Sequence, residues 1–349
     1  MSYCLDARTW AEEQFGSCKL ADKRRTRRLI DVASRMATDP SGSLPEMESW
    51  SDLKAAYRLF DCDDVTFEAI AEPHWRRTRR RTSGRYLVIN DTTQLDFGLT
   101  KKIDGLAPTG NNTGRGFLLH TALMVESQTK AIVGVAGQKI HYRRPAPKLE
   151  SDTQRLKRDR ESQLWGAMID AVGSPIDQVQ WVHVCDRGAD NFEVFCHLME
   201  QRADWVMRAS ALHRVILTPD GKRLALKAHL PHLKLAGTYE LKLRSRKDQP
   251  ARTANLEVRY GVIQLLVPPH KSPYLQKRRP QPIATTVLWL REVGKPNGTA
   301  PIEWVLYTSL AVATFEDAWE VIEYYESRWL IEVYQPECTS SALLYRLAA

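Results

Sequence analysis

Apolar residues recur at helical spacing in the first part of the chain. The segments 29–36 and 53–60 each repeat apolar side chains every three or four positions, and the turn-rich run 40–43 separates them. Such spacing is typical of amphipathic helices that bury one face. The pattern therefore predicts a small helical unit over residues 1–75.

From Tyr86 onward the apolar residues gather in short runs instead. Three consecutive runs are followed by alternating helical and strand-like patterns, which predicts a mixed α/β sheet with helices on both faces. This element order is that of a ribonuclease-H-like core. The predicted strands are 86–90, 118–126, 131–140, 179–185 and 205–208, and the predicted helices are 152–171 and 190–201.

Residues 211–303 interrupt this order with short apolar runs and turn-rich pieces, which predicts a β-rich insertion. Helical spacing returns at Phe315 and continues to about Val333, so we expect one long helix with Glu332 near its end.

Composition indicates a folded protein with a polyanionic partner. The 349 residues are 43% hydrophobic and carry a formal net charge of +8, and basic residues cluster in 23–28, 74–81 and 143–160. The six cysteines form no C-x-x-C pair, and no signal peptide or membrane-spanning run is apparent. We expect a protein of a reducing cytoplasm that is neither exported nor inserted into a membrane.

Three acidic residues stand where chemistry is expected. Asp91 and Asp186 each follow an apolar run predicted as a strand, and Glu332 lies in the last helical stretch. Side chains at strand ends gather at one edge of an open sheet, and carboxylates are preferred ligands of hard divalent cations. We therefore expect a divalent-metal site that acts on phosphate esters. Taken singly, each aspartate is better explained as a turn or cap residue; their shared position in one predicted sheet favours the site.

Tyr325, Arg328 and Glu332 are spaced so that a helix places them on one face. Because Arg328 and Glu332 are four residues apart, the simpler interpretation is an exposed salt bridge. The functional alternative is that Arg328 grips a DNA phosphate while Glu332 holds metal.

Other chemically interesting residues also leave two interpretations open. Trp304 is either a core aromatic or a stacking platform for an unstacked base. His120 and His183 lie on apolar strands and are interpreted as satisfied core histidines. The basic run of the first helical unit fits either DNA contact or a solvated face, and its arginines are Arg24, Arg25, Arg27 and Arg28.

Motifs along nearly the whole chain, to about Gln335, carry a family resemblance. They are Trp10-Ala-x-x-x-Phe15, Leu20-Ala-Asp-Lys-Arg-Arg-Thr-x-Arg-Leu29, Ala56-Tyr-Arg-Leu-Phe60, Asp91-Thr-Thr, Arg115-Gly-Phe-x-x-His120, Cys185-Asp-Arg-x-Ala-Asp190, Arg208-Ala-Ser and Tyr325-x-x-Arg-Trp-x-Ile-Glu332. In this order they resemble the bacterial DDE transposases of the insertion-sequence-4 family, in the branch related to the transposon-five transposase.

The resemblance implies a helical DNA-end-binding domain over 1–75, a ribonuclease-H-like catalytic core over 76–210 and 304–335, and a β-rich insertion over 211–303. It implies two Mg²⁺ or Mn²⁺ ions held by the catalytic residues Asp91, Asp186 and Glu332. It also assigns DNA contacts to Arg24, Arg25, Arg27, Arg28, Arg208, Trp304, Tyr325 and Arg328.

The implied activity is metal-dependent cut-and-paste transposition of an insertion sequence. It comprises binding of transposon ends, phosphodiester hydrolysis, hairpin formation and strand transfer into a target. The implied partners are double-stranded DNA, as inverted-repeat ends and as target, and a second copy of the chain. The resemblance also implies a bacterial cytoplasmic protein that is associated with the nucleoid.

The sequence departs from the family pattern after Gln335. Pro336 predicts a break in the helix, and Thr339 stands at the position of a family lysine. We expect residues 336–349 to be an aberrant, truncated tail without the helices that pair subunits. Two alternatives to an active transposase therefore stay open: an inactive remnant that only binds DNA, and a non-transposing ribonuclease-H-like nuclease.

Overall fold

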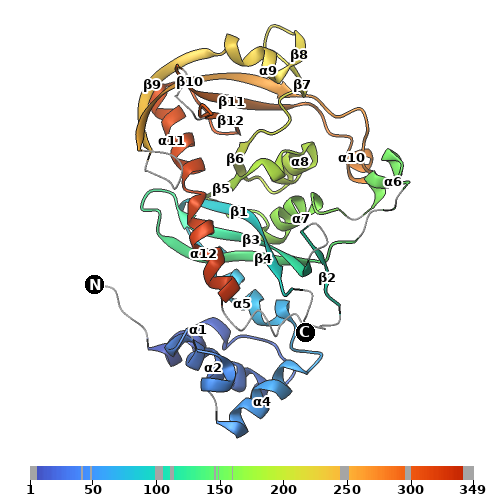
Figure 1. Cartoon of the computed structure of the whole chain (residues 1–349), viewed down its shortest axis with the longest axis vertical. Helices are drawn as coiled ribbons and strands as arrows, with labels where there is room; N and C mark the ends of the chain where they lie inside the picture. Colours follow the sequence, from blue (N-terminus) through green and yellow to red (C-terminus); the bar gives the residue numbers. More distant parts are fainter. Residues whose placement is uncertain are drawn as a thin grey trace.

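Helices occupy the chain before its first strand and lie at the base of the molecule in Figure 1. The computed structural model describes residues 6–40, 42–47, 49–98, 105–110, 114–144, 147, 149–158, 160–243, 251–294 and 300–340. The first helices are α1 (Ala7–Phe15), α2 (Lys23–Thr38), α3 (Leu44–Met47), α4 (Trp50–Phe60) and α5 (Phe67–Arg79). Polar side chains cap four of them by accepting backbone N–H bonds, namely Asp6, Asp22, Ser49 and Thr66.

The small helical unit has an apolar interior of its own. Leu29 and Val32 of α2 are buried against clusters that include Leu53 and Leu59 of α4. The fifth helix, α5, contacts both α1 and strand β4 and so connects this unit to the sheet.

The strands that the structure describes form one mixed sheet of twelve. They are β1 (Gly84–Asp96), β2 (Ala107–Thr109), β3 (Gly114–Glu126), β4 (Ile132–His141), β5 (Val179–Cys185), β6 (Asp204–Arg208), β7 (Val215–Leu217), β8 (Arg223–Ala225), β9 (Lys234–Leu243), β10 (Arg252–Leu265), β11 (Ile283–Glu292) and β12 (Glu303–Thr308). The central path runs β3-β1-β5-β6-β12-β11-β10, with β4 on the outer side of β3. Strands β1, β5 and β6 are parallel, and the other pairings are antiparallel.

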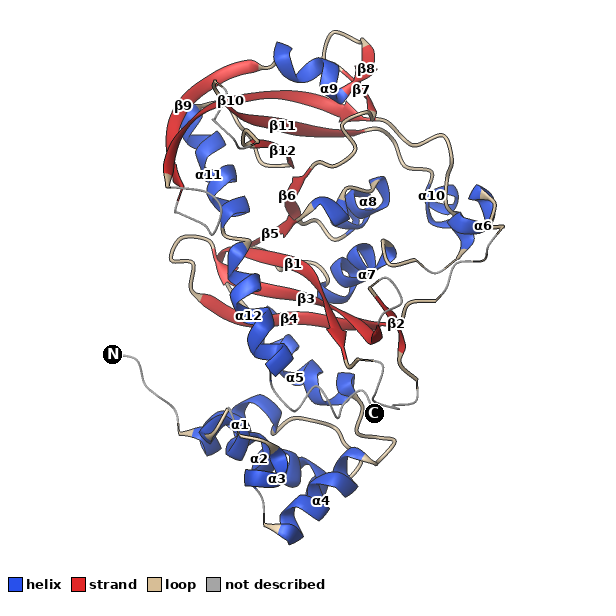
Figure 2. Ribbon diagram, viewed as in Figure 1, coloured by secondary structure: helices blue, strands red, loops and turns tan. Residues whose placement is uncertain are grey.

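Helices cover both faces of the sheet (Figure 2). In β1, Leu87 and Ile89 face a cluster with α5, α11 (Phe315–Glu326) and α12 (Trp329–Ser340). The intervening Val88 faces the opposite side and packs with α7 (Gln163–Val172). Helix α8 (Phe192–Glu200) covers β6. The mixed sheet, its helical covers and the N-terminal helices agree with the expected fold class at this level.

The prediction of one helix over 152–171 is wrong in one respect, because two helices form there. Helix α6 (Asp152–Lys157) ends at Arg158, which is extended and pairs with Glu150, and α7 starts at Gln163. The charged first segment has no apolar face to bury, whereas six residues of α7 are buried. Two short helices, α9 (Leu226–His229) and α10 (Pro273–Arg278), lie within 211–303.

The prediction of one long helix from Phe315 to Val333 is also wrong, because the helix is interrupted between α11 and α12. Both the N–H and the hydroxyl of Ser327 donate to the carbonyl of Glu323, and the Arg328 N–H donates to Tyr325 three residues back. This tightening ends α11. Glu332 therefore lies in the first turn of α12, where a carboxylate is favoured by the helix dipole.

The break expected at Pro336 is wrong as well. The backbone of α12 stays helical to Ser340. A proline inside a helix removes one hydrogen bond, but the neighbouring turns can hold the backbone. Helix α5 continues past Pro73 in the same way. Residues 341–349 of the expected tail lie outside the described residues.

Candidate functional site

The sheet brings Asp91 and Asp186 together. Asn90 of β1 pairs with Cys185, the last residue of the parallel strand β5, so the two aspartates occupy the next, adjacent positions. Neighbouring strands lie only about 4.8 Å apart. Alternation along both strands directs these positions to the face covered by α11 and α12, since Ile89 and Val184 face that side.

The buried thiol of Cys185 reports the same proximity. Burial, followed by the charges of Asp186 and Asp91, raises the pKa of this thiol well above its usual range. The sequence predicted that Asp91 follows the end of its strand. This is wrong, because β1 continues to Asp96. Asp91 lies instead where β5 ends beside it.

Glu332 reaches the same place from the helical cover. Helix α12 packs on β1, and Ile331 is fully buried in the cluster between them. Arg328, in the break before α12, connects the helix to the sheet: one guanidinium nitrogen lies 3.6 Å from an Asp91 carboxylate oxygen and another donates to Glu332. Figure 1 shows α12 crossing over the end of the sheet that contains β1.

The carboxylates suit a hard divalent cation by their chemistry but not by their arrangement. Among the described residues, no group of three histidine, cysteine or acidic side chains is placed to hold a metal ion. The Arg328 guanidinium instead contacts both Asp91 and Glu332. As arranged, the residues do not fit a bound metal.

The turn after β5 is held by its own carboxylates. Asp186 accepts the backbone N–H of Gly188 at 2.7 Å and so caps the short helix η1 (Arg187–Ala189). An added Cβ at Gly188 would lie 3.1 Å from this carboxylate and 3.0 Å from the Trp165 ring, so a side chain there would crowd Asp186.

Asp190 joins this turn to the segment that follows β6. Its side chain is fully buried and accepts the backbone N–H groups of Ser210 and Ala211 at 2.7 and 2.8 Å. Its other oxygen lies 2.7 Å from the Arg214 guanidinium. The signal for Asp190 in the sequence is its place in the motif that begins at Cys185, yet sequence reasoning gave it no role.

Arg208, Trp304 and Tyr325 lie together beside the carboxylates. The Trp304 ring on β12 meets the Tyr325 ring edge-on at 5.5 Å, and the Arg208 guanidinium is 5.9 Å from the centre of the Trp304 ring. Tyr325 is buried, whereas Trp304 and Arg208 are half-buried.

Two core histidines lie directly behind the site. His183 and His120 are fully buried, and burial lowers the pKa of each to about 3. One ring nitrogen of each bonds Asn90 or Thr92, while Nε2 has no hydrogen-bond partner. The interpretation as core histidines is confirmed, but only half of their hydrogen-bonding capacity is satisfied.

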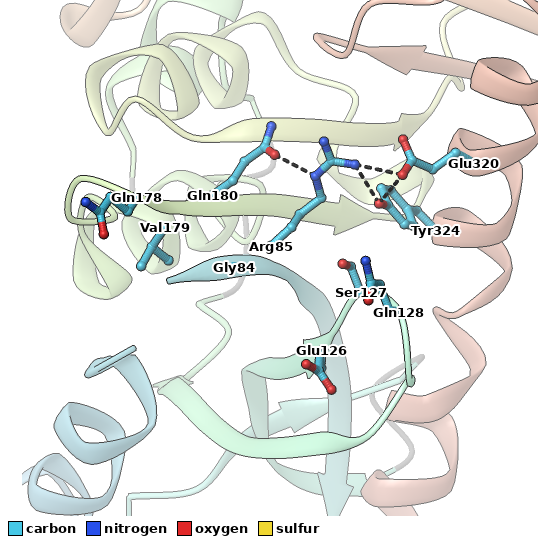
Figure 3. Close-up of a pocket in the computed structure, with 10 residues that line it drawn as sticks. All are labelled: Gly84, Arg85, Glu126, Ser127, Gln128, Gln178, Val179, Gln180, Glu320 and Tyr324. Atoms are coloured by element: carbon cyan, nitrogen blue, oxygen red, sulfur yellow. Dashed lines mark hydrogen bonds and ion pairs between the residues drawn. The ribbon is translucent and has the colours of Figure 1, made fainter. Parts of the chain in front are cut away.

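A polar cavity of about 620 Å³ lies at the opposite end of β1 and β5 (Figure 3). Arg85 crosses it and donates to Gln180, Glu320 and the hydroxyl of Tyr324. Because Glu320 and Tyr324 belong to α11, these bonds anchor that helix to the start of β1.

The arginines of α2 divide into two kinds. Arg25 pairs with Asp64 at 2.7 Å and Arg28 with Asp52 at 3.0 Å, so both hold the helical unit together. Arg24 and Arg27 are exposed, although Arg24 also pairs with the capping Asp22.

Helix α4 offers a second outward face that sequence reasoning missed. Trp50, Lys54, Tyr57 and Arg58 follow at helical spacing and are all exposed, with Trp50 at 76%. Aromatic and basic side chains on one helix face are typical of nucleic-acid contact. The available signal was the i, i+4, i+7, i+8 spacing of these four residues.

Comparison with known protein families supports this interpretation of the N-terminal unit. Residues 7–65 match the family model of a transposase DNA-binding domain. The match covers α1 to α4 and supports a DNA-binding role in a transposase. Within the part of the chain that the structure describes, no helix is long and apolar enough to cross a membrane.

Proposed function

We propose that the protein is a DNA transposase of the insertion-sequence-4 type. Its N-terminal unit binds the ends of the element, and Asp91, Asp186 and Glu332 form the centre that cuts and rejoins phosphodiester bonds. The observation that carries the proposal is the adjacency of Asp91 and Asp186 under the helix that bears Glu332, in a chain whose N-terminal unit matches a transposase DNA-binding domain.

The order of the sheet supports a ribonuclease-H-like core. Three antiparallel strands, β4-β3-β1, are extended by the parallel strands β5 and β6. Dependence on Mg²⁺ or Mn²⁺ belongs to the proposal and has support from the donor chemistry alone. Pairing of two copies of the chain stays a prediction.

The outward basic residues support DNA contact by two surfaces. On the N-terminal unit these are Arg24 and Arg27 of α2, together with the exposed face of α4. Near the carboxylates, Arg208 and Trp304 offer a cation beside an aromatic ring.

Cleavage of labelled DNA that carries the element's own ends tests the proposal. With Mg²⁺ or Mn²⁺ present, the intact chain is expected to nick the DNA or close a hairpin, and Asp186→Ala is expected to lower the rate by about a thousand-fold or more, since metal-site carboxylates supply several kcal/mol of transition-state stabilisation.

The control is Asp170→Ala, which removes an exposed carboxylate of α7 that pairs with His197. End-specific binding without cleavage by any variant would favour an inactive DNA-binding remnant. Cleavage that ignores the end sequence would favour a non-transposing nuclease.

A further inference from the structure

The turn that contains Asp186 is short and lies outside the sheet. Strand β5 ends at Cys185, and η1 follows at once and covers only Arg187–Ala189. A single 3₁₀ turn has poorer hydrogen-bond geometry than an α-helix, so it depends on contacts with the surrounding protein. The position of Asp186 beside Asp91 therefore depends on what holds this turn in place.

Asp190 binds the end of this turn to the segment that follows β6. Its fully buried carboxylate accepts the backbone N–H groups of Ser210 and Ala211 at 2.7 and 2.8 Å, and the Ser210 hydroxyl at 3.3 Å. All three donors meet the same carboxylate oxygen. Because hydrogen bonds to an ionised acceptor are roughly twice as strong as neutral ones, this contact fixes the direction of the side chain.

Arg214 compensates the buried charge of Asp190. One guanidinium nitrogen lies 2.7 Å from the other carboxylate oxygen and donates to the backbone carbonyl of Asp190 at 3.1 Å. The guanidinium also lies 6.0 Å from the centre of the Tyr307 ring on β12. A buried ion pair is strongly destabilised when one partner is removed, because the other charge then stays buried without compensation.

The segment that receives Asp190 is itself fixed to the sheet. The N–H of Ala209 donates to the carbonyl of Val305 on β12 at 2.8 Å, and Arg208 is paired with β12 as well. Val305 follows Trp304 in the chain, so the strand that holds this segment also bears that ring. Asp190 therefore connects the turn after β5 to both β6 and β12.

We propose that Asp190 is a positioning residue for Asp186. It binds the turn after β5 to the start of the segment 211–303 and so keeps Asp186 beside Asp91, without touching the reacting groups itself. Its effect on cleavage rests on the proposed function, whereas the fixed turn can be measured without any activity.

The variant Asp190→Asn tests the proposal in the full chain. It preserves the size of the side chain but replaces one acceptor with a donor and leaves Arg214 without an opposite charge. The single-turnover rate of cleavage of DNA that carries the element's ends is expected to fall by about a hundred-fold, since a displacement of about 1 Å can cost this much. The affinity for the same DNA is expected to stay unchanged.

The matched control is the same substitution at the other end of β6. The carboxylate of Asp204 accepts the Gln180 side-chain amide at 2.6 Å and the Ser309 hydroxyl at 2.7 Å. Asp204→Asn thus also disturbs a carboxylate that joins neighbouring segments. It is expected to lower the melting temperature and to leave the cleavage rate unchanged, which separates positioning from a general loss of stability.

Amide hydrogen exchange of the same variants measures the turn directly. In Asp190→Asn, the amides of 187–189 are expected to exchange at least about ten-fold faster than in the unaltered protein, because the turn opens more often. In Asp204→Asn these amides are expected to exchange at the unaltered rate.

A milder variant is available if circular dichroism shows that Asp190→Asn does not fold. Arg214→Lys retains the positive charge but loses the planar fork that reaches both the carboxylate and the carbonyl of Asp190. It is expected to show the same pattern with a smaller loss of cleavage rate, of about ten-fold.

Equal cleavage rates of folded Asp190→Asn and Asp204→Asn would overturn the proposal, as would unchanged amide exchange at 187–189. A loss that appears only as weaker DNA affinity would overturn it as well. If the unaltered protein does not cleave, the proposed function is wrong, and amide exchange alone then decides whether Asp190 holds the turn.

Discussion

His120 and His183 make the stability of the protein depend on pH. Burial lowers the pKa of both to about 3, whereas an unfolded histidine titrates near about 6.5. Below that value the unfolded chain binds more protons than the folded one, so the free energy of unfolding falls as pH falls from about 6.5 towards 3. We expect a loss of up to about 1.4 kcal/mol per pH unit for each histidine, measured by urea unfolding at pH 7 and pH 5.

The control for this prediction is a matched pair of substitutions. His183→Asn removes one of the two buried rings and should reduce the pH dependence, whereas His270→Asn alters an exposed residue and should not. An equal pH dependence in His183→Asn and the unaltered protein would contradict the role assigned to burial.

At the residue scale, the sequence predicted where candidate site residues lie better than it predicted which side chains they contact. Asp91 and Asp186 were recognised because each follows an apolar run, and that pattern is local. The partners of Arg25 and Arg28 are Asp64 and Asp52, 39 and 24 residues away, so no local pattern could separate these arginines from the exposed ones. The Arg328–Asp91 contact depends on the packing of α12 on β1, so it could not be predicted from the sequence either.

Helix α4 is the element whose exposed face can be tested directly. Arg58→Ala is expected to weaken DNA binding uniformly across sequences and to reduce the slope of log affinity against log salt by about 1, as for the loss of one phosphate contact. Fluorescence anisotropy of labelled DNA at several salt concentrations measures both quantities.

Arg28→Ala serves as the contrasting variant. Because Arg28 pairs with Asp52 inside the helical unit, its loss should lower the melting temperature and leave the salt slope nearly unchanged. If Arg58→Ala keeps the full slope, the α4 face does not contact phosphate.

At the scale of elements, the predicted helix boundaries were wrong where a single side chain ends a helix within a continuous apolar pattern. The apolar spacing of 315–333 fits one helix, but Ser327 ends it by bonding back to Glu323. Because of this break, the two helices have different positions on the sheet. Helix α11 is anchored at the start of β1 through Arg85, while α12 carries Glu332. Spacing alone could not reveal the break, because serine occurs in helices as well.

The whole molecule depends on the segment 211–303. Trp205 and Met207 of β6 are buried together with Leu265 and Trp289 from this segment. Burying one large apolar side chain contributes about 1.5–3 kcal/mol, and a typical protein has only about 5–15 kcal/mol of net stability. Replacing the segment with a short Gly-Ser linker is therefore expected to abolish cooperative unfolding, as measured by near-ultraviolet circular dichroism and dye binding.

The comparison is a chain from which residues 1–65 are removed. Their apolar clusters lie mainly among α1, α2 and α4, so the sheet is expected to stay folded. Cooperative unfolding of the chain without 211–303 would contradict the shared core.

At this scale the sequence predicted the class of fold but not its continuity. The short apolar runs predicted a β-rich segment over 211–303, and five described strands, β7 to β11, lie within it. Their junction with the rest depends on β12 pairing with both β6 and β11, a contact between distant segments. Strand pairing of this kind leaves no local signature, so the continuity of the sheet could not be predicted from the sequence.

This junction also determines how the molecule can move. The N–H of Ala209 bonds to Val305, and β12 is hydrogen-bonded on both sides, so the described strands of 211–303 are joined to β6 and β5 by continuous strand pairing. Because backbone hydrogen bonds join these strands side by side, the strands of 211–303 and the strand that precedes Asp186 are expected to move as one rigid unit.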